Sequence, residues 1–168
     1  MADFTTPTFA QVDALPTVLE ATVPQDWIDE NGHMNISHFF DIGGEAAWKF
    51  CQGLGLQRLY EAEPPTGLFT TEHHLTYLSE LRLGERLSAH VRCVDVGPKS
   101  VHLITLILDR ERERVATVFE VVLVHVDMTA RKAAAFPEEF REALEAAVAA
   151  DGDLGWPAPV CGAMGVRR

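Results

Sequence analysis

The sequence predicts an α+β domain in which a curled antiparallel sheet wraps around one long central helix. Two observations lead to this prediction. Apolar residues recur at helical spacing over residues 36–54, and strand patterns separated by turn signals follow over residues 67–127. The 168 residues suffice for one domain with a substantial core. We therefore expect a single domain over residues 1–168, with its core at about 19–148.

The central helix is the most strongly patterned segment. Its apolar positions recur every three or four residues and are Ile36, Phe40, Gly43, Ala47, Cys51 and Leu54. Asn35 can cap the start of this helix, and Gly53 or Gly55 its end. Gly43 and Gly44 lie in its interior, where each glycine costs about 1 kcal/mol relative to alanine. We therefore expect another element, such as the sheet, to pack against the helix backbone there.

Strands are predicted before and after this helix. They cover residues 19–23, 67–81, 86–96, 101–109 and 115–127. The third of these alternates between apolar and polar residues, which is typical of a strand with one buried face. Short turn signals connect the last three strands, so residues 83–127 are predicted to form an antiparallel meander. A proline-led helix at 136–150 and an irregular tail at 151–168, anchored by Trp156, complete the domain.

Composition excludes several classes of function. The formal net charge of −11 argues against a nucleic-acid partner, because nothing global attracts phosphate backbones. No apolar run approaches the roughly 20 residues of a membrane-spanning helix. The first residues carry neither a basic nor an apolar signal region, so we expect a cytoplasmic protein without membrane contact. Cys51, Cys93 and Cys161 are scattered without a CxxC pair, which indicates reduced thiols.

The stretch DENGHMN at residues 29–35 concentrates groups that carry or accept protons directly before the central helix. From these residues alone, Asp29 is either a loop acid or a catalytic carboxylate, and Asn35 is a helix cap. The first N–H groups of a helix lack partners within it, so the backbone at Met34–Ile36 is a natural site for a developing oxyanion. Gly32 permits the tight turn that aims this segment.

Three motifs together resemble one family. WIDENGHMNISHFF resembles the D-x-N-G-H-M-N-x-x-x-Y segment of hotdog-fold acyl-CoA thioesterases. TTEHHLTYLSELRLGERL is similar to the family's E-x-H-I-x-Y-x-x-E-x-x-x-G-x-x-L strand, and ATVFEVVLVHVDMTARKAAAFP is similar to its A-T-x-E-x-x-x-x-H-V-D ending. The resemblance is to the 4-hydroxybenzoyl-CoA thioesterase type, and more closely to the betainyl-CoA thioesterase-like branch. Phe39 stands where the family usually has tyrosine.

The resemblance implies hydrolysis of a small or medium acyl-CoA by an enzyme with the hotdog fold. It implies that Asp29 acts as general base or as nucleophile, two roles that the sequence leaves open. The candidate catalytic residues are Asp29, His33, Asn35 and Glu72. The candidate substrate-binding residues are Asn31, Gly32, Met34, Ile36, Phe39, Thr71 and His74. Each also has a purely structural interpretation, such as turn geometry for Asn31 or a cross-strand pair for Glu72.

The second motif adds a strand to this site. Even spacing predicts that Glu72 and His74 share one strand face with Thr70 and Thr76, close to the start of the central helix. Apolar pocket residues are expected from Phe39, Phe40 and Phe69, which equally suit the core. A cationic acyl group such as betaine can stack on such rings.

A metal site is an alternative that the sequence disfavours. His33, His38, His73 and His74 are potential ligands, but adjacent strand residues point to opposite faces and no HExxH or Cys–His spacing occurs. We therefore expect no metal and no cofactor, with coenzyme A entering only as part of the substrate. Two other functions remain open, an enoyl-CoA hydratase of the same fold and a noncatalytic acyl-CoA-binding protein. The hydratase pattern D-x-N-P-x-H is broken at Gly32.

Association of subunits follows from the same resemblance. Hotdog domains usually pair edge to edge, with active sites at the junction, and an exposed sheet edge favours such pairing. We therefore expect a homodimer or a dimer of dimers, that is, a homotetramer.

Overall fold

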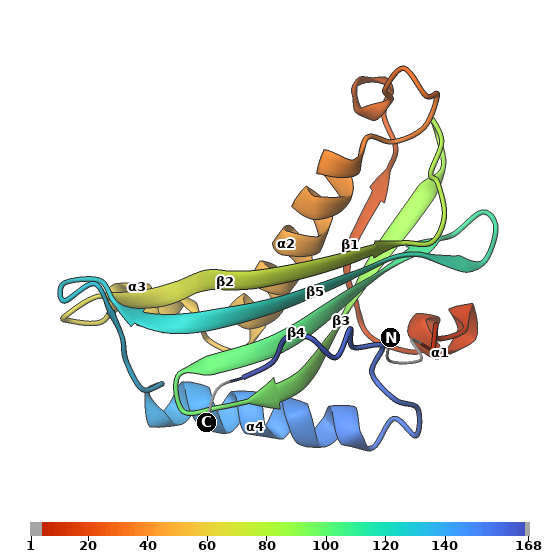
Figure 1. Ribbon diagram of the computed structural model, residues 1–168. Coiled ribbons are helices and arrows are strands. Elements are labelled where there is room, and N and C mark those ends of the chain that lie inside the picture. Colours follow the sequence, from red (N-terminus) through yellow and green to blue (C-terminus); the bar gives the residue numbers. More distant parts are fainter. Residues whose placement is uncertain (1–4, 167–168) are drawn as a thin grey trace.

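The computed structural model describes residues 5–166 and shows a curled antiparallel sheet with helices on its concave face (Figure 1). The strands are β1 (Thr17–Thr22), β2 (Thr66–Tyr77), β3 (Arg86–Val96), β4 (Ser100–Asp109), β5 (Arg114–Asp127) and β6 (Lys132–Ala133). The order in the sheet is β1-β3-β4-β5-β2, and β6 pairs with β5. The predicted meander is therefore confirmed for β3, β4 and β5, and β2 forms one edge of the sheet.

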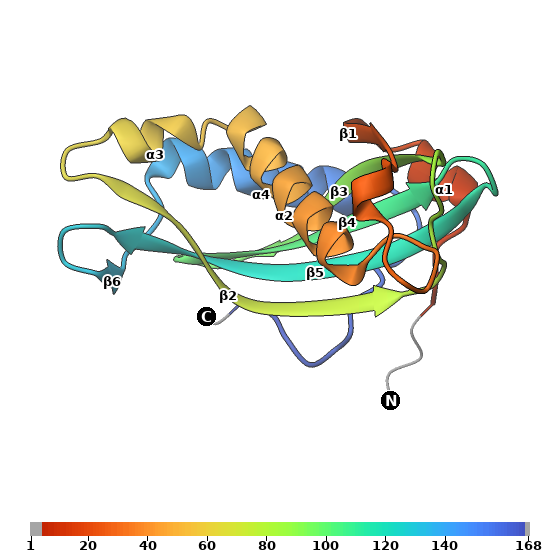
Figure 2. The ribbon, with the colours of Figure 1, turned by 90° about the horizontal axis from the view of Figure 1, so that it is seen from above.

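The helices differ in length and place. They are α1 (Phe9–Asp13), the 3₁₀ turn η1 (Gln25–Trp27), α2 (Ile36–Gly53), α3 (Gln57–Glu61) and α4 (Glu138–Gly152). Figure 2 shows α2, α3 and α4 on one side of the sheet and the C-terminal tail on the other. The short α1 was not predicted, although Thr8 and Gln11 form a capping box at its start. Within residues 5–166, none of the helices combines the length and the hydropathy needed to span a bilayer.

The main core lies between α2 and the concave face of the sheet. Gly43 is the point of closest approach, because a Cβ atom placed there would lie 2.5 Å from the ring of Phe119. The hydroxyl of Thr105 also donates a hydrogen bond to the Gly43 carbonyl, at 3.0 Å. The expected close packing is thus confirmed at Gly43. At Gly44 it is wrong, since a Cβ atom there would meet nothing within 4 Å.

The first turn of α2 departs from the predicted apolar stripe. Ile36 is 61% exposed and Phe40 is 42% exposed. The buried face runs instead through Phe39, Ile42, Ala46 and their neighbours. The expectation that Ile36 and Phe40 are buried in the core is therefore wrong for the single chain, although one edge of the Phe40 ring still meets Phe119 and His73 of the sheet.

The convex face of the sheet is also covered. Val12 and Leu15, with Phe9 and Trp156 beside them, pack on the convex face against residues of β4 and β5. The polar residues of β3 on this side, including His90, are consequently buried. The prediction of a half-buried β3 is wrong, because segments remote in sequence fold over its polar side. Figure 2 shows the tail passing beneath the sheet.

Candidate active site

The loop before α2 is a tight turn held by its own backbone. The N–H of Asp29 donates to the carbonyl of His33 at 3.1 Å, and the N–H of Gly32 donates to the carbonyl of Asp29 at 3.0 Å. Gly32 has φ of +80°, a left-handed conformation that glycine adopts at little cost. An isolated bridge between Ile28 and Met34 closes the turn. The sequence DENGHMN therefore folds back on itself and delivers Asn35 to the helix start.

The carboxylate of Asp29 is oriented from two sides. One oxygen accepts the backbone N–H of Asn31 at 2.8 Å, and the other accepts the side-chain amide of Asn35 at 3.2 Å. The backbone hydrogen bond from Asn31 is the largest influence that lowers the pKa of Asp29, and His33 and the Asn35 amide lower it further. Partial desolvation opposes this and is the second-largest influence, but the net effect is a lowered pKa of Asp29. Asp29 is thus held as an ionised acceptor, as a base or nucleophile requires.

Asn35 has two roles in this arrangement. Its side-chain oxygen caps α2 by accepting the backbone N–H of Ser37 at 3.0 Å, and its amide nitrogen donates to Asp29. A helix cap and the orientation of the carboxylate therefore depend on one side chain.

Of the three backbone N–H groups predicted to form the oxyanion site, only one remains available to a substrate. The N–H of Met34 donates to the carbonyl of Leu81 at 2.7 Å, and the N–H of Asn35 donates to the carbonyl of Trp27 at 2.8 Å. Both are therefore unavailable to a substrate, which corrects the broader prediction. The N–H of Ile36 has no hydrogen-bond partner among residues 5–166. The side chain of Met34 is fully buried in the core, so only its backbone borders this site.

His33 influences two acidic side chains electrostatically, those of Asp29 and Glu80. Its Nδ1 is 3.3 Å from the carbonyl oxygen of Met34. The pKa of Glu80 is lowered mainly by its hydrogen bond from Arg82, and His33 contributes a smaller effect in the same direction. His33 is thus near both Asp29 and Glu80, the latter a residue that the sequence marked only as part of a motif.

Aromatic side chains surround the first turns of α2. Phe39 is buried and meets the ring of Tyr77 edge to face, with ring centroids 5.6 Å apart. Phe40 meets His73 in the same way at 4.8 Å. Trp27 stacks on His38 at 4.9 Å. Phe40 and Tyr77 remain partly exposed, so apolar surface lies beside the loop that carries Asp29.

The candidate residues of β2 do not lie beside the Asp29 loop. They are Thr71, Glu72 and His74. Register pairs Thr70 with Leu123, whereas Glu72 pairs with Val122 after a bulge at Thr71. The bulge moves Glu72 and His74 to the convex face, away from α2 and from Thr70. The prediction that these two residues share a face with Thr70 near the helix start is therefore wrong for the single chain. A strand pattern in sequence does not reveal a bulge.

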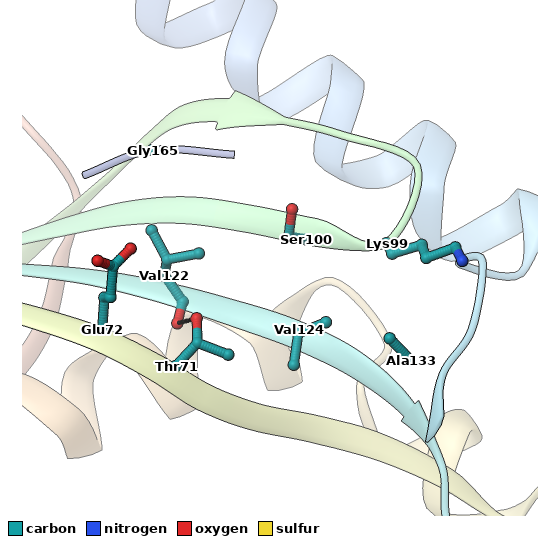
Figure 3. A pocket seen from close by; sticks show the side chains of 8 residues that line it. All are labelled: Thr71, Glu72, Lys99, Ser100, Val122, Val124, Ala133 and Gly165. Atoms are coloured by element: carbon teal, nitrogen blue, oxygen red, sulfur yellow. Dashed lines mark hydrogen bonds between the residues drawn. The ribbon is translucent and has the colours of Figure 1, made fainter. Parts of the chain in front are cut away.

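Thr71 and Glu72 line a cavity of about 550 Å³ on that convex face, as Figure 3 shows. The other lining residues are Lys99, Ser100, Val122, Val124, Ala133 and Gly165. No residue of the Asp29 loop lines it. The residues predicted for one site thus form two groups, one at the Asp29 loop and one on the convex face of the sheet.

The histidines do not form the metal site that was considered. Within the part of the chain that the structure describes, the group of potential ligand atoms lying within 4.8 Å of one another comes from His74, Glu120 and Cys161. His73 points to the other face of β2, where its ring contacts Phe40 and Phe119.

Known proteins resemble this chain along most of its length. The L-carnitine dehydrogenase/betainyl-CoA thioesterase of Agrobacterium fabrum is 33% identical over 126 residues, which are 75% of this chain and 26% of that protein. The chain thus spans about a quarter of the first relatives it matches. The betainyl-CoA thioesterase of Pseudomonas aeruginosa is 25% identical over 150 residues, covering 89% of this chain and 94% of that protein.

Solved structures and a family model agree with this. A hypothetical protein from Staphylococcus aureus, solved in complex with CoA, superposes with a TM-score of 0.79 and 26% identity. The superposition covers 91% of this chain and 97% of that one, which confirms the predicted hotdog fold. The model of the thioesterase-like superfamily matches residues 23–144. The chain therefore belongs to the thioesterase-like superfamily.

Proposed function

We propose that the protein hydrolyses a small or medium acyl-CoA thioester to the free acid and coenzyme A, with Asp29 as the acting carboxylate. The observation that carries this proposal is the Asp29 carboxylate, held ionised by Asn31 and Asn35 beside the start of α2. The N–H of Ile36, at the same helix end, donates to none of the residues that the structure describes. A base and an oxyanion donor at one place are what acyl transfer to water requires.

The proposed reaction needs only these groups and water. Asp29 removes a proton from water while the water oxygen bonds to the thioester carbon, or Asp29 itself attacks and a mixed anhydride is then hydrolysed. The carbonyl oxygen becomes negative and accepts the Ile36 N–H. The C–S bond then breaks and its electron pair stays on sulfur. In the first route Asp29 passes the proton taken from water to the thiolate. In the second route this cleavage yields the anhydride, and its hydrolysis by water regenerates Asp29 and releases the proton that the thiolate takes up. Coenzyme A thus takes part only as the substrate's carrier.

The comparisons support the substrate class. Relatives carry the name betainyl-CoA thioesterase, and a structural neighbour was solved with CoA. A betainyl group ends in a trimethylammonium cation, which aromatic faces attract. Phe40 lies one helical turn after Ile36, and Tyr77 packs on Phe39; both rings are exposed and suit such a group.

The decisive experiment is thiol release from a panel of acyl-CoAs by wild type, Asp29→Asn and Glu30→Gln. Asp29→Asn keeps an oxygen for the Asn31 N–H but removes the base. We expect kcat/KM to fall about 10²–10⁴-fold. Glu30 is the adjacent exposed acid and makes no hydrogen bond with the described residues, so Glu30→Gln should retain activity. Equal activity in Asp29→Asn would contradict the assigned role.

The same panel separates the other functions. Hydration of an enoyl-CoA without thiol release would identify a hydratase, and tight binding without turnover would identify an acyl-CoA-binding protein. Betainyl-CoA and 3,3-dimethylbutanoyl-CoA have the same shape but differ in charge. A preference for betainyl-CoA would support recognition of the cation by the aromatic rings, and equal rates would exclude it.

We also propose that two chains associate through the free edge of β2. This strand pairs only with β5 within the described residues, and its residues 70–74 are exposed. Ile36, Phe40, Tyr77 and Leu78 add exposed apolar surface near this edge. Long exposed edges and apolar patches both favour association.

Light scattering after size exclusion tests this association. We expect twice or four times the 18.6 kDa chain mass for wild type. Phe40→Ser should shift the mass toward one chain. Leu83→Ser, a matched change at an exposed residue outside α2 and β2, should not. A monomeric wild type would contradict the proposal.

A further inference from the structure

Three strands and the tail bring polar side chains together on the convex face of the sheet. His74 of β2 lies opposite Glu120 of β5, which lies opposite Ile104 of β4. His102, two residues before Ile104, reaches Glu120 from β4. The tail crosses this face and contributes Cys161 (Figure 2). This cluster lies outside the candidate active site, and the proposed thioester hydrolysis does not use it.

The donor atoms are close and of mixed type. One atom each of His74, Glu120 and Cys161 lie within 4.8 Å of one another. A tetrahedral zinc ion, with ligand bonds of about 2.0–2.3 Å, needs donor atoms roughly 3.3–3.8 Å apart. Small side-chain rotations therefore bring the three atoms to binding distance. We propose that His74, Glu120 and Cys161 bind a zinc ion between the sheet and the C-terminal tail.

The surroundings of Glu120 orient it for this role. Its Oε1 lies 2.7 Å from Nε2 of His102, and its Oε2 accepts the backbone N–H of Cys161 at 2.8 Å. The side chains of His102 and Glu120 are only 4% and 1% exposed. A buried carboxylate held at both oxygens keeps a fixed direction, and each oxygen retains a second lone pair for a metal.

The sulfur and the imidazole complete the argument for zinc. The N–H of Ala163 donates to the sulfur of Cys161 at 3.4 Å, which helps to fix the direction of this side chain. Sulfur and imidazole donors select zinc over magnesium or calcium, which prefer oxygen ligands only. His74 is exposed, so the fourth position of the ion opens toward solvent and takes water. Through its coordinate bonds, a zinc ion would link Cys161 of the tail to β2 and β5.

Cys161 offers a direct readout. Of the three cysteines, Cys51 and Cys93 are buried and Cys161 is partly exposed. A thiol-alkylating reagent added to the native protein should therefore modify Cys161, and Cys161→Ser should abolish the modification. After removal of bound metals with a chelator, we expect one equivalent of zinc chloride to slow this modification at least about tenfold. Native mass spectrometry should show one zinc ion per chain.

Single substitutions test which side chains bind the zinc ion. His74→Gln should remove the protection, and so should Glu120→Gln. Because His74 is exposed, its variant should fold even where Glu120→Gln fails to. His102→Gln, which loses only a supporting contact, should weaken zinc binding about 10–100-fold. His73→Gln is the matched control on the opposite face of β2 and should retain protection. Absent protection in wild type, or protection that survives His74→Gln, would overturn the proposal.

Discussion

The two faces of the sheet are buried by different means. On the concave side, α2 meets the sheet through apolar side chains and one glycine, so shape and volume decide the fit. On the convex side, buried His90, Arg92 and Glu120 each have polar partners supplied by segments remote in sequence. The difference teaches that one sheet can have a mainly apolar core on one face and, on the other, an apolar cluster interspersed with hydrogen-bonded polar side chains.

Arg92 illustrates the convex layer. Its guanidinium donates to both carboxylate oxygens of Asp151, at 2.6 and 2.8 Å, and lies 3.9 Å from the ring centroid of Trp156. His90 contacts the carbonyl of Leu15 at 3.0 Å on the same face. The segment around Leu15, before the sheet in sequence, and the segment of Asp151 and Trp156, after it, are thereby held to β3.

We expect the largest loss of stability when Arg92 can no longer pair with Asp151 on the convex side. Arg92→Met preserves the stem but removes the charge, which leaves Asp151, only 11% exposed, without its bidentate partner. Breaking a buried ion pair in this way typically costs about 3–5 kcal/mol. We expect the free energy of unfolding, measured by urea denaturation, to fall by this amount.

A double variant tests the origin of that loss. Arg92→Met with Asp151→Leu replaces both charges, so much of the lost stability should return. If the double variant is as unstable as Arg92→Met, packing of the arginine stem rather than the unpaired carboxylate explains the loss.

The concave face should respond to volume, and adjacent glycines provide the comparison. Gly43→Ala forces a methyl group against Phe119, and overpacking of a core costs about 1–3 kcal/mol. Gly44→Ala meets open space and should gain up to about 1 kcal/mol of helix stability. Thermal denaturation of both variants should therefore shift in opposite directions. Shifts of the same sign would show that α2 does not seat on Phe119 as the structure has it.

Sequence patterns predicted the concave face better than the convex one. The spacing of Gly43, Ala47 and Cys51 along one helix contains the information for its packing, because neighbours in the helix share a face. The burial of His90 and Arg92 depends on α1 and on the tail, which lie far away in sequence and lack long periodic patterns. Local alternation in β3 was therefore read as solvent exposure of these residues.

The candidate site shows the same contrast between residues that a local sequence pattern predicts correctly and residues that it does not. Asp29, Asn35 and Gly32 form one turn, so a short motif sufficed to predict their proximity. Glu72 and His74 were placed with them by strand alternation, and the bulge at Thr71 moved both to the other face. The cluster with Cys161 was not predicted, since the tail has no periodicity that fixes where it crosses the sheet.

The smallest loss of stability, and the sharpest functional contrast, is expected at Asn35. Asn35→Ala removes both the cap of α2 and the amide donor to Asp29, so stability should fall by about 0.5–2 kcal/mol. Asn35→Asp keeps an oxygen for the Ser37 N–H, so the cap persists, but it places a second negative charge beside Asp29. Asn35→Ala thus loses both the helix cap and the amide donor, whereas Asn35→Asp loses only the donor. Comparing the two variants separates the effect of the cap from the effect of the contact with Asp29.

Their pH profiles follow from the sign of the Asp29 pKa shift. The contacts from Asn31 and Asn35 lower this pKa, and a carboxylate base acts when deprotonated, so wild-type activity should decline only below the usual aspartate range. Loss of the amide donor raises the pKa, and a neighbouring negative charge raises it further. The acidic limb of kcat/KM should thus move upward in Asn35→Ala and further in Asn35→Asp, although Asn35→Asp is the more stable variant. If the acidic limb instead moved further in Asn35→Ala, the less stable variant, the titrating group would not be Asp29.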